Sequence, residues 1–174
     1  MNNPIISVKN LSVEYVTGIK SVQAVHNVSF EINSGEIFGL VGESGSGKST
    51  VVQAMMRILP PPALISKGNV FINKEDIMAA SEADIINVRW KKISIVMQSA
   101  LNALNPVLSV REQIHDVLKI HKGLIGSEAG NRAKELLSLV DIEHNRLDSF
   151  PHQLSGGMKQ RIVIAIALAI MPPI

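Results

Sequence analysis

The sequence predicts an α/β fold with an N-terminal antiparallel β region and a largely helical second half. Residues 5–16 and 22–32 alternate apolar and polar side chains, as strands with one buried face do. Residues 37–41 form a short, continuously apolar run, which is typical of a strand buried on both faces. Residues 109–147 place apolar side chains three and four positions apart, the spacing of amphipathic helices.

The other elements follow from the same patterns. The turn signal Thr17–Lys20 joins the first two strands into a hairpin, and three prolines at 60–62 end a helix that starts at Lys48. Ser81, followed by Asp84, is expected to cap a helix. The complete expectation adds strands at 68–72 and 93–97, and helices at 48–59, 81–90, 109–121, 128–140 and 154–170.

Composition narrows the classes of function. The 174 residues are 46% hydrophobic and 18% charged, so the chain is expected to be globular. The net charge of +2 comes without a clustered basic stripe, which argues against nucleic acid as a partner. There is no cysteine, the N-terminus has no signal-peptide pattern, and the apolar run 162–171 is about half of the roughly 20 residues that span a bilayer. Five scattered histidines lack metal-ligand spacing: His26, His115, His121, His144 and His152.

A glycine-rich segment follows the apolar run 37–41 and matches the phosphate-binding P-loop pattern. Its glycines allow backbone N–H groups to approach phosphates, and it ends at a helix N-terminus, which favours anions. Lys48 is placed to reach the β- and γ-phosphates, Ser49 to bind Mg²⁺, and Glu43 to face solvent. The alternative is an ordinary glycine-rich turn. The loop comprises Gly42, Glu43, Ser44, Gly45, Ser46, Gly47, Lys48, Ser49 and the adjoining Thr50.

A second motif, Leu154-Ser155-Gly156-Gly157, stands at the start of the last expected helix. A serine and two glycines at a helix start form an anion-accepting site on the same physical grounds. Alone the motif is more often a turn, but its combination with the P-loop is specific.

Together these motifs make the chain resemble the ATP-binding subunits of ABC transporters, from about Val8 to the last residue. Residues 42–50 are similar to their Walker A motif, Gln98 to the Q-loop glutamine and 154–160 to the signature motif. Met158 replaces the common glutamine of the signature, which resembles the oligopeptide/dipeptide/nickel import branch. Segments 104–107 and 150–153 resemble that branch too.

The resemblance implies an ATP-dependent role. Tyr15 would stack on adenine, and Gln98 would touch Mg²⁺ and the attacking water. Two ATP-binding subunits, as a homo- or heterodimer, would pair head to tail, so that Ser155 and Gly157, with Gly156 between them, contact the γ-phosphate held by Lys48 of the other copy. Transmembrane permease subunits would be further partners, which places the chain peripherally on the cytoplasmic face of the membrane, with ATP and Mg²⁺ as cofactors.

The family organisation also implies boundaries. We expect an antiparallel β region with the P-loop nucleotide-binding core at 1–98, a helical subdomain at 99–154, and the signature motif with its helix at 155–174. The Walker B strand, with its Mg²⁺-binding aspartate and catalytic glutamate, would begin after Pro173. The chain therefore reads as the N-terminal part of a transport ATPase, lacking the C-terminal part of the core.

Hydrolysis is consequently an activity of the family that we do not expect from residues 1–174 alone, and nucleotide binding is expected to be weak. Hydrolysis abolished by Lys48→Ala would refute this. One alternative is a truncated, non-catalytic nucleotide-binding or interaction protein. Another is a DNA-handling ABC-type ATPase, which a salt-sensitive DNA-binding assay would reveal.

Overall fold

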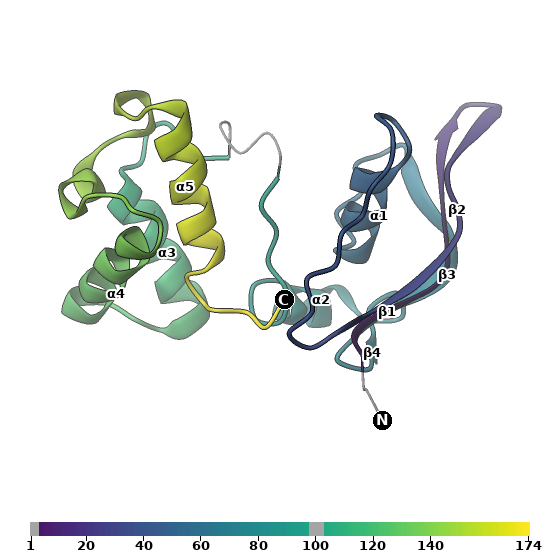
Figure 1. Cartoon of the computed structure of the whole chain (residues 1–174), viewed down its shortest axis with the longest axis horizontal. Helices are drawn as coiled ribbons and strands as arrows, with labels where there is room; N and C mark the ends of the chain where they lie inside the picture. Colours follow the sequence, from purple (N-terminus) through teal and green to yellow (C-terminus); the bar gives the residue numbers. More distant parts are fainter. Residues whose placement is uncertain (1–3, 98–102) are drawn as a thin grey trace. The chain divides into compact units, whose positions relative to one another are not determined.

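The computed structural model describes residues 4–97 and 103–174. The chain divides into two compact units, with bounds Met1–Ile85 and Ile86–Ile174. Figure 1 shows a sheet with a helix beside it in the first unit and a group of helices in the second.

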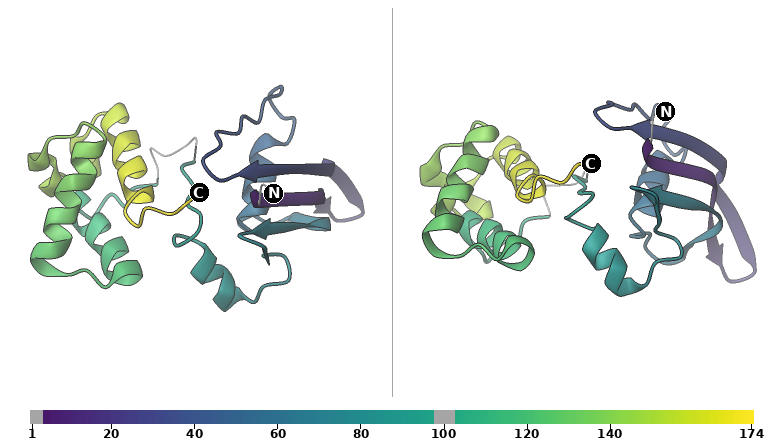
Figure 2. Two further views of the ribbon diagram at one scale, coloured as in Figure 1. Left: turned by 60° about the horizontal axis from the view of Figure 1, so that its bottom comes forward. Right: turned by 90° about the horizontal axis from the view of Figure 1, so that it is seen from below.

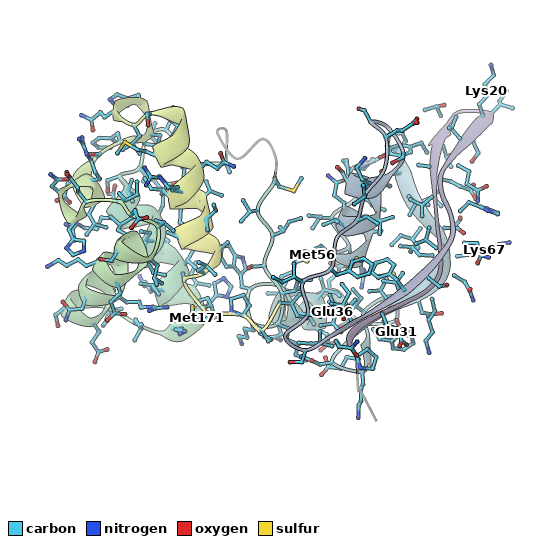
Figure 3. The ribbon with its side chains drawn as sticks, in the orientation of Figure 1. Lys20, Glu31, Glu36, Met56, Lys67 and Met171 are labelled. Atoms are coloured by element: carbon cyan, nitrogen blue, oxygen red, sulfur yellow. The ribbon has the colours of Figure 1, made fainter. Side chains whose placement is uncertain are left out.

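The first unit is built on a four-stranded antiparallel sheet of order β2-β1-β3-β4. β1 (Pro4–Thr17) and β2 (Lys20–Asn33) form the expected hairpin, and Lys20 marks its tip in Figure 3. β3 (Ala63–Ile72) contains the predicted strand 68–72, and β4 (Glu75–Asp76) is a short edge strand. Alternation along β1 and β3 buries one face of the sheet, with side chains from Ile6, Val8, Leu11, Val13, Val70 and Ile72.

Helix α1 (Lys48–Met55) covers the buried face of this sheet (Figures 1 and 2). It presents Val51, Ala54 and Met55 on its buried side. On the opposite side of the sheet, Lys67 points away from α1 (Figure 3). Because α1 starts at Lys48, the glycine-rich loop lies at the N-terminal end of this packed helix.

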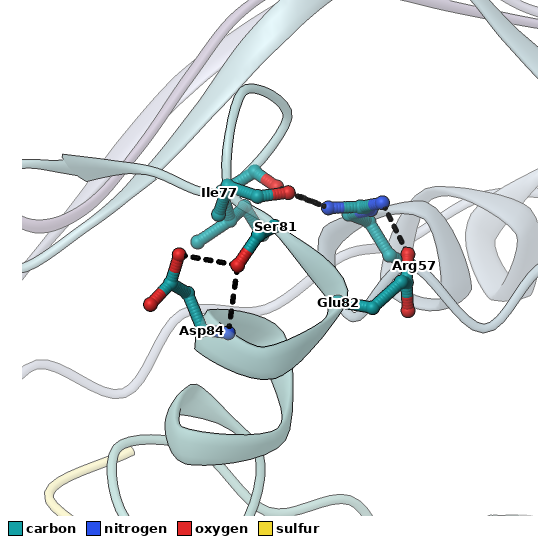
Figure 4. Close-up of polar contacts among 6 residues, drawn as sticks. Arg57, Ile77, Ser81, Glu82 and Asp84 are labelled. Carbon is teal, nitrogen blue, oxygen red and sulfur yellow. Dashed lines mark hydrogen bonds and ion pairs between the residues drawn. The ribbon is translucent and has the colours of Figure 1, made fainter.

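A polar clamp joins the end of α1 to the start of α2 (Glu82–Val88), as Figure 4 shows. The Arg57 guanidinium donates to the carbonyl oxygens of Ile77 at 3.1 Å and Ala80 at 2.7 Å, and pairs with Glu82 at 2.6 Å. Ser81 accepts from the Asp84 backbone N–H at 3.2 Å, which confirms the predicted cap.

Two strand predictions were wrong. Residues 37–41 and 93–97 have no strand conformation, apart from an isolated bridge between Arg89 and Ile93. Ile37 is fully exposed at 100% and Val41 is exposed at 93%. A strand exists through a ladder of hydrogen bonds to a neighbouring strand, and among residues 4–97 and 103–174 neither run has such a ladder. Apolar composition favours burial but does not supply that partner.

The second unit packs three helices around one apolar cluster: α3 (Val110–Lys122), α4 (Gly126–Leu139) and α5 (Gly156–Ala167). Two 3₁₀ turns, η2 (His144–Asp148) and η3 (Pro151–Gln153), lead into α5. The helices occupy the ranges that periodicity predicted, to within a few residues. Among the largest fully buried side chains of the cluster are Ile114, Leu118, Leu136, Leu137, Leu147 and Ile162.

Charged side chains fasten the ends of these helices. Arg111 of α3 pairs with Asp148 of η2 through two contacts of 2.7 and 3.0 Å. Arg161 of α5 donates to the carbonyl oxygens of Val140 and Asp141, where α4 ends.

Of the helices in residues 4–97 and 103–174, none has the length and apolar character needed to cross a membrane.

Candidate functional site

The glycine-rich loop curls back on itself between residue 41 and helix α1. Gly45 and Gly47 have φ of 80° and 89°, in the left-handed region that favours glycine. A Cβ on Gly42 would lie 2.9 Å from the Ser46 hydroxyl, so the loop closes tightly at that point. Glu43 is exposed, as expected.

The Lys48 side chain folds back over this loop. Its Nζ donates to the carbonyl oxygen of Gly42 at 2.8 Å and of Glu43 at 2.6 Å, with the Ser46 hydroxyl at 3.4 Å. The ammonium group is therefore held at the mouth of the loop by three oxygen atoms.

The first turn of α1 is open to an anion. Its N-cap is Gly47, which offers no side-chain hydrogen bond, and no acidic residue stands in the first turn. The N–H groups at a helix start carry partial positive charge and need acceptors. Ser49 is exposed in this turn, whereas Thr50 is buried at 9% exposure. Lys48, the helix start and the loop glycines thus lie together at the N-terminal end of α1.

Tyr15 lies near the end of β1 in the same unit. It stands opposite Val22 of β2 and Ala63 of β3 in the sheet register, and its side chain is half-buried. A ring with one exposed part is available for stacking, but its role as the adenine platform stays a prediction.

The second motif begins helix α5 in the other unit. Ser155 is the N-cap, and its hydroxyl accepts from the Met158 backbone N–H at 3.3 Å. Gly156 and Gly157 are exposed, and a Cβ on Gly157 would meet nothing within 4 Å. The motif therefore presents an unobstructed helix start.

Gln98, the predicted Q-loop residue, lies outside the described residues. Within the described ranges, no group of three or more His, Asp or Glu side chains could hold a metal ion. The predicted site residues thus fall into one assembled loop at 42–50, Tyr15 in the same unit, and Ser155–Gly157 in the second unit.

Comparison with known proteins identifies the family. The ABC transporter family model matches residues 25–174. The chain belongs to the ABC transporter family. A solved structure described as the dimeric structure of MJ0796, a bacterial ABC transporter cassette, superposes with a TM-score of 0.86 at 32% identity, covering 96% of this chain and 70% of that one. The fold is therefore that of the ABC transporter cassette.

Curated relatives in this family are named as peptide transport proteins. The oligopeptide transport ATP-binding protein OppD of Bacillus subtilis is 42% identical over 171 residues, which are 97% of this chain and 48% of that protein. The dipeptide transport ATP-binding protein DppD of the same organism is 42% identical over 173 residues, 98% and 52% of the two chains. The chain spans about half the length of the curated relatives it matches.

Sequence reasoning missed one pair of residues beside the site. Ala24 and Val25 of β2 contact the position of Gly47: a Cβ there would lie 2.5 Å from the Ala24 carbonyl oxygen and 3.4 Å from Val25 Cγ2. Neither residue carries a motif, since one contributes a backbone atom and the other an ordinary core side chain.

Proposed function

We propose that the chain binds Mg²⁺-ATP through residues 42–50 and serves as part of the ATP-binding subunit of an ABC importer for peptides. The observation that carries this is the assembled loop, with the Lys48 ammonium at its mouth and the uncapped start of α1 beside it. A triphosphate supplies negative charge for the ammonium group and acceptor oxygens for the unpaired N–H groups of the helix start.

The residues present fit a nucleotide-borne Mg²⁺ better than a metal bound by the protein alone. No cluster of metal-ligating side chains exists among the described residues, so the phosphate oxygens would provide most ligands. The exposed Ser49 hydroxyl is the protein group at α1 that would complete them. Gln98 is proposed as a further ligand on the family resemblance alone.

Two further contacts rest on the same proposal: one with the adenine base, and one with the nucleotide of a second subunit. Tyr15 would stack on adenine, a contact worth about 1–3 kcal/mol. Ser155 and Gly157 would meet the γ-phosphate bound to a second ATP-binding subunit, because their helix start is exposed and unobstructed. We propose the remaining properties for the whole protein. They are ATP hydrolysis, peptide or alternatively nickel as the transported solute, permease partners, and a peripheral place at the cytoplasmic face of the membrane.

Equilibrium binding of ATP by the chain tests the proposal. Lys48→Ala removes the ammonium group at the loop mouth, and we expect it to weaken ATP binding at least tenfold, since charge-assisted hydrogen bonds to phosphate contribute about 1.5–3 kcal/mol. Lys67→Ala is the matched control, because it removes the same charge from the opposite face of the sheet. Equal affinities in the wild type and Lys48→Ala would refute the proposal.

Sedimentation of the chain with and without Mg²⁺-ATP tests the head-to-tail arrangement. We expect Gly157→Asp to suppress ATP-dependent association, because a carboxylate would repel the phosphate, while the chain itself has room for the side chain. Gly130→Asp on α4 is the control, since a Cβ there also meets nothing within 4 Å. Identical association of both variants would contradict this arrangement.

A further inference from the structure

Strand β2 contains one extra residue beside the candidate phosphate loop. The register pairs Val13 with Val25 and Glu14 with Gln23, so one step along β1 corresponds to two steps along β2. Ala24 therefore has no Cα partner in this register, which is the pattern of a β-bulge. Bulges bend the strand and redirect backbone groups, and they are frequent next to functional sites.

The redirected backbone reaches Gly47. The carbonyl oxygen of Ala24 lies 2.5 Å from where a Cβ on Gly47 would be, and Val25 Cγ2 lies 3.4 Å from the same point. Val25 is itself fixed, because it is only 4% exposed and is paired with the fully buried Val13. Gly47 thus lies against β2, an element that is not part of its own loop.

Gly47 in turn sets the orientation of the groups that would meet phosphate. With φ of 89° it is the N-cap of α1, and Lys48 is the first residue of that helix. A left-handed residue between loop and helix determines where the first-turn N–H groups point. Any displacement of Gly47 would therefore redirect the helix start and the root of the Lys48 side chain together.

We propose that the bulge at Ala24, with the Val25 side chain, is a positioning element that preorganises the loop for the phosphate chain of the nucleotide. Ala24 and Val25 act through Gly47 and do not contact the ligand. This inference rests on the proposed function of residues 42–50. It makes β2 a determinant of phosphate affinity, separate from the stacking role proposed for Tyr15.

The test compares two ligands, ATP and inorganic tripolyphosphate, with Mg²⁺ present. Val25→Ala removes the Val25 methyl groups beside the Gly47 position. We expect it to weaken the binding of both ligands by a similar factor, on the order of tenfold, because small misplacements of binding groups have large effects. Tyr15→Ala is expected to weaken ATP while leaving tripolyphosphate unchanged.

Val70→Ala is the matched control for the loss of a buried valine. Val70 is fully buried in β3, which does not adjoin β2 in the sheet. All dissociation constants are measured at a temperature where circular dichroism shows each variant folded. Equal tripolyphosphate affinities for Val25→Ala and Val70→Ala would overturn the inference and leave the proposed function intact. A wild-type chain that binds neither ligand would overturn the proposed function itself.

A second measurement uses the unaltered chain, in case Val25→Ala does not fold. The carbonyl ¹³C resonance of Ala24 is followed by NMR while tripolyphosphate is added. We expect it to shift with the same dissociation constant as the Gly47 amide resonance, whereas the Val70 carbonyl resonance does not shift. A stationary Ala24 resonance during saturation of Gly47 would overturn the inference.

Discussion

Gly45 and Gly47 illustrate two reasons for a glycine in the same loop: a left-handed φ, and a lack of space for a side chain. Both have left-handed φ, but a Cβ on Gly45 would meet nothing within 4 Å, whereas on Gly47 it would overlap the Ala24 carbonyl oxygen. We expect Gly45→Ala to reduce the free energy of unfolding by about 1–2 kcal/mol, the cost of a left-handed non-glycine residue. Gly47→Ala should cost more, because β2 must also move.

Urea unfolding of the two variants measures this difference. The unfolding slope serves as the internal check, because a changed slope would signal an altered unfolded or native ensemble instead of a changed stability. Equal losses for Gly45→Ala and Gly47→Ala would show that β2 yields without cost.

His121 gives the second unit a dependence on pH. Its ring stacks on Trp90 with centroids 5.4 Å apart, and burial, followed by the charge of Lys91, lowers the pKa of His121 below its ordinary value of 6.5. The folded chain therefore disfavours the protonated ring. The stability that depends on neutral His121 is present above pH 6.5 and is lost as the pH falls below it.

Thermal unfolding at a series of pH values tests this sign. The midpoint of the wild type should fall more steeply below pH 6.5 than that of His121→Gln, in which no ring can titrate. A wild-type curve parallel to that of His121→Gln would refute the prediction.

At the scale of elements, helix α3 depends on its N-terminal cap. Ser109 accepts from the Glu112 backbone N–H at 3.3 Å, and Glu112 accepts from the Ser109 backbone N–H at 2.7 Å. This capping box satisfies two of the N–H groups that a helix start leaves unpaired. We expect Ser109→Ala to lower the free energy of unfolding by about 1 kcal/mol.

Ser127→Ala is the control for this substitution, because Ser127 is exposed in the first turn of α4. Its effect should stay within about 0.5 kcal/mol, as for most surface substitutions. Chemical unfolding of the second unit, followed by helical circular dichroism, compares the two. If Ser109→Ala left the free energy of unfolding unchanged, water would replace the cap without cost.

The helices could be predicted because their signals are local. Ser81 and Asp84 indicate a helix cap within four residues. The spacing of apolar residues alone indicates the buried faces of α3 and α4. The wrongly predicted strands at 37–41 and 93–97 depended on a partner that periodicity cannot name. The bulge at Ala24 was likewise invisible, since it arises from the register between two strands and leaves no signature in either.

The loop of the candidate site could be located from the sequence for the same reason, because its signal is local. Loop 42–49 is specified by residue types at fixed spacing, so its composition and position could be read directly. Its seat on β2 could not, because Ala24 contributes only a carbonyl oxygen and every residue has one.

At the scale of the whole molecule, exposed apolar side chains in 37–41 affect behaviour in solution. Ile37 and Val41 are almost entirely accessible, and Phe38 and Leu40 are exposed as well. We expect the double variant Ile37→Ser, Val41→Ser to change the free energy of unfolding by no more than about 0.5 kcal/mol per site, because little buried area is lost. It should also reduce self-association, which contiguous exposed apolar residues promote.

Static light scattering at increasing protein concentration, together with urea unfolding, checks both parts. Ile6→Ser is the contrasting variant, since Ile6 is only 1% exposed and its loss should destabilise the sheet strongly. A large loss of stability in the double variant would show that the 37–41 segment is packed in solution.

The chain contains a single tyrosine and a single tryptophan, and each unit holds one of them: Tyr15 in β1 and Trp90 beside His121. Selective excitation of the indole therefore reports on the helical unit without a contribution from the sheet. Tyrosine absorbance reports on the sheet. Because Tyr15 is the proposed base platform, tyrosine is the chromophore to follow in ligand titrations. Unfolding curves recorded with both chromophores would resolve whether the two units melt together.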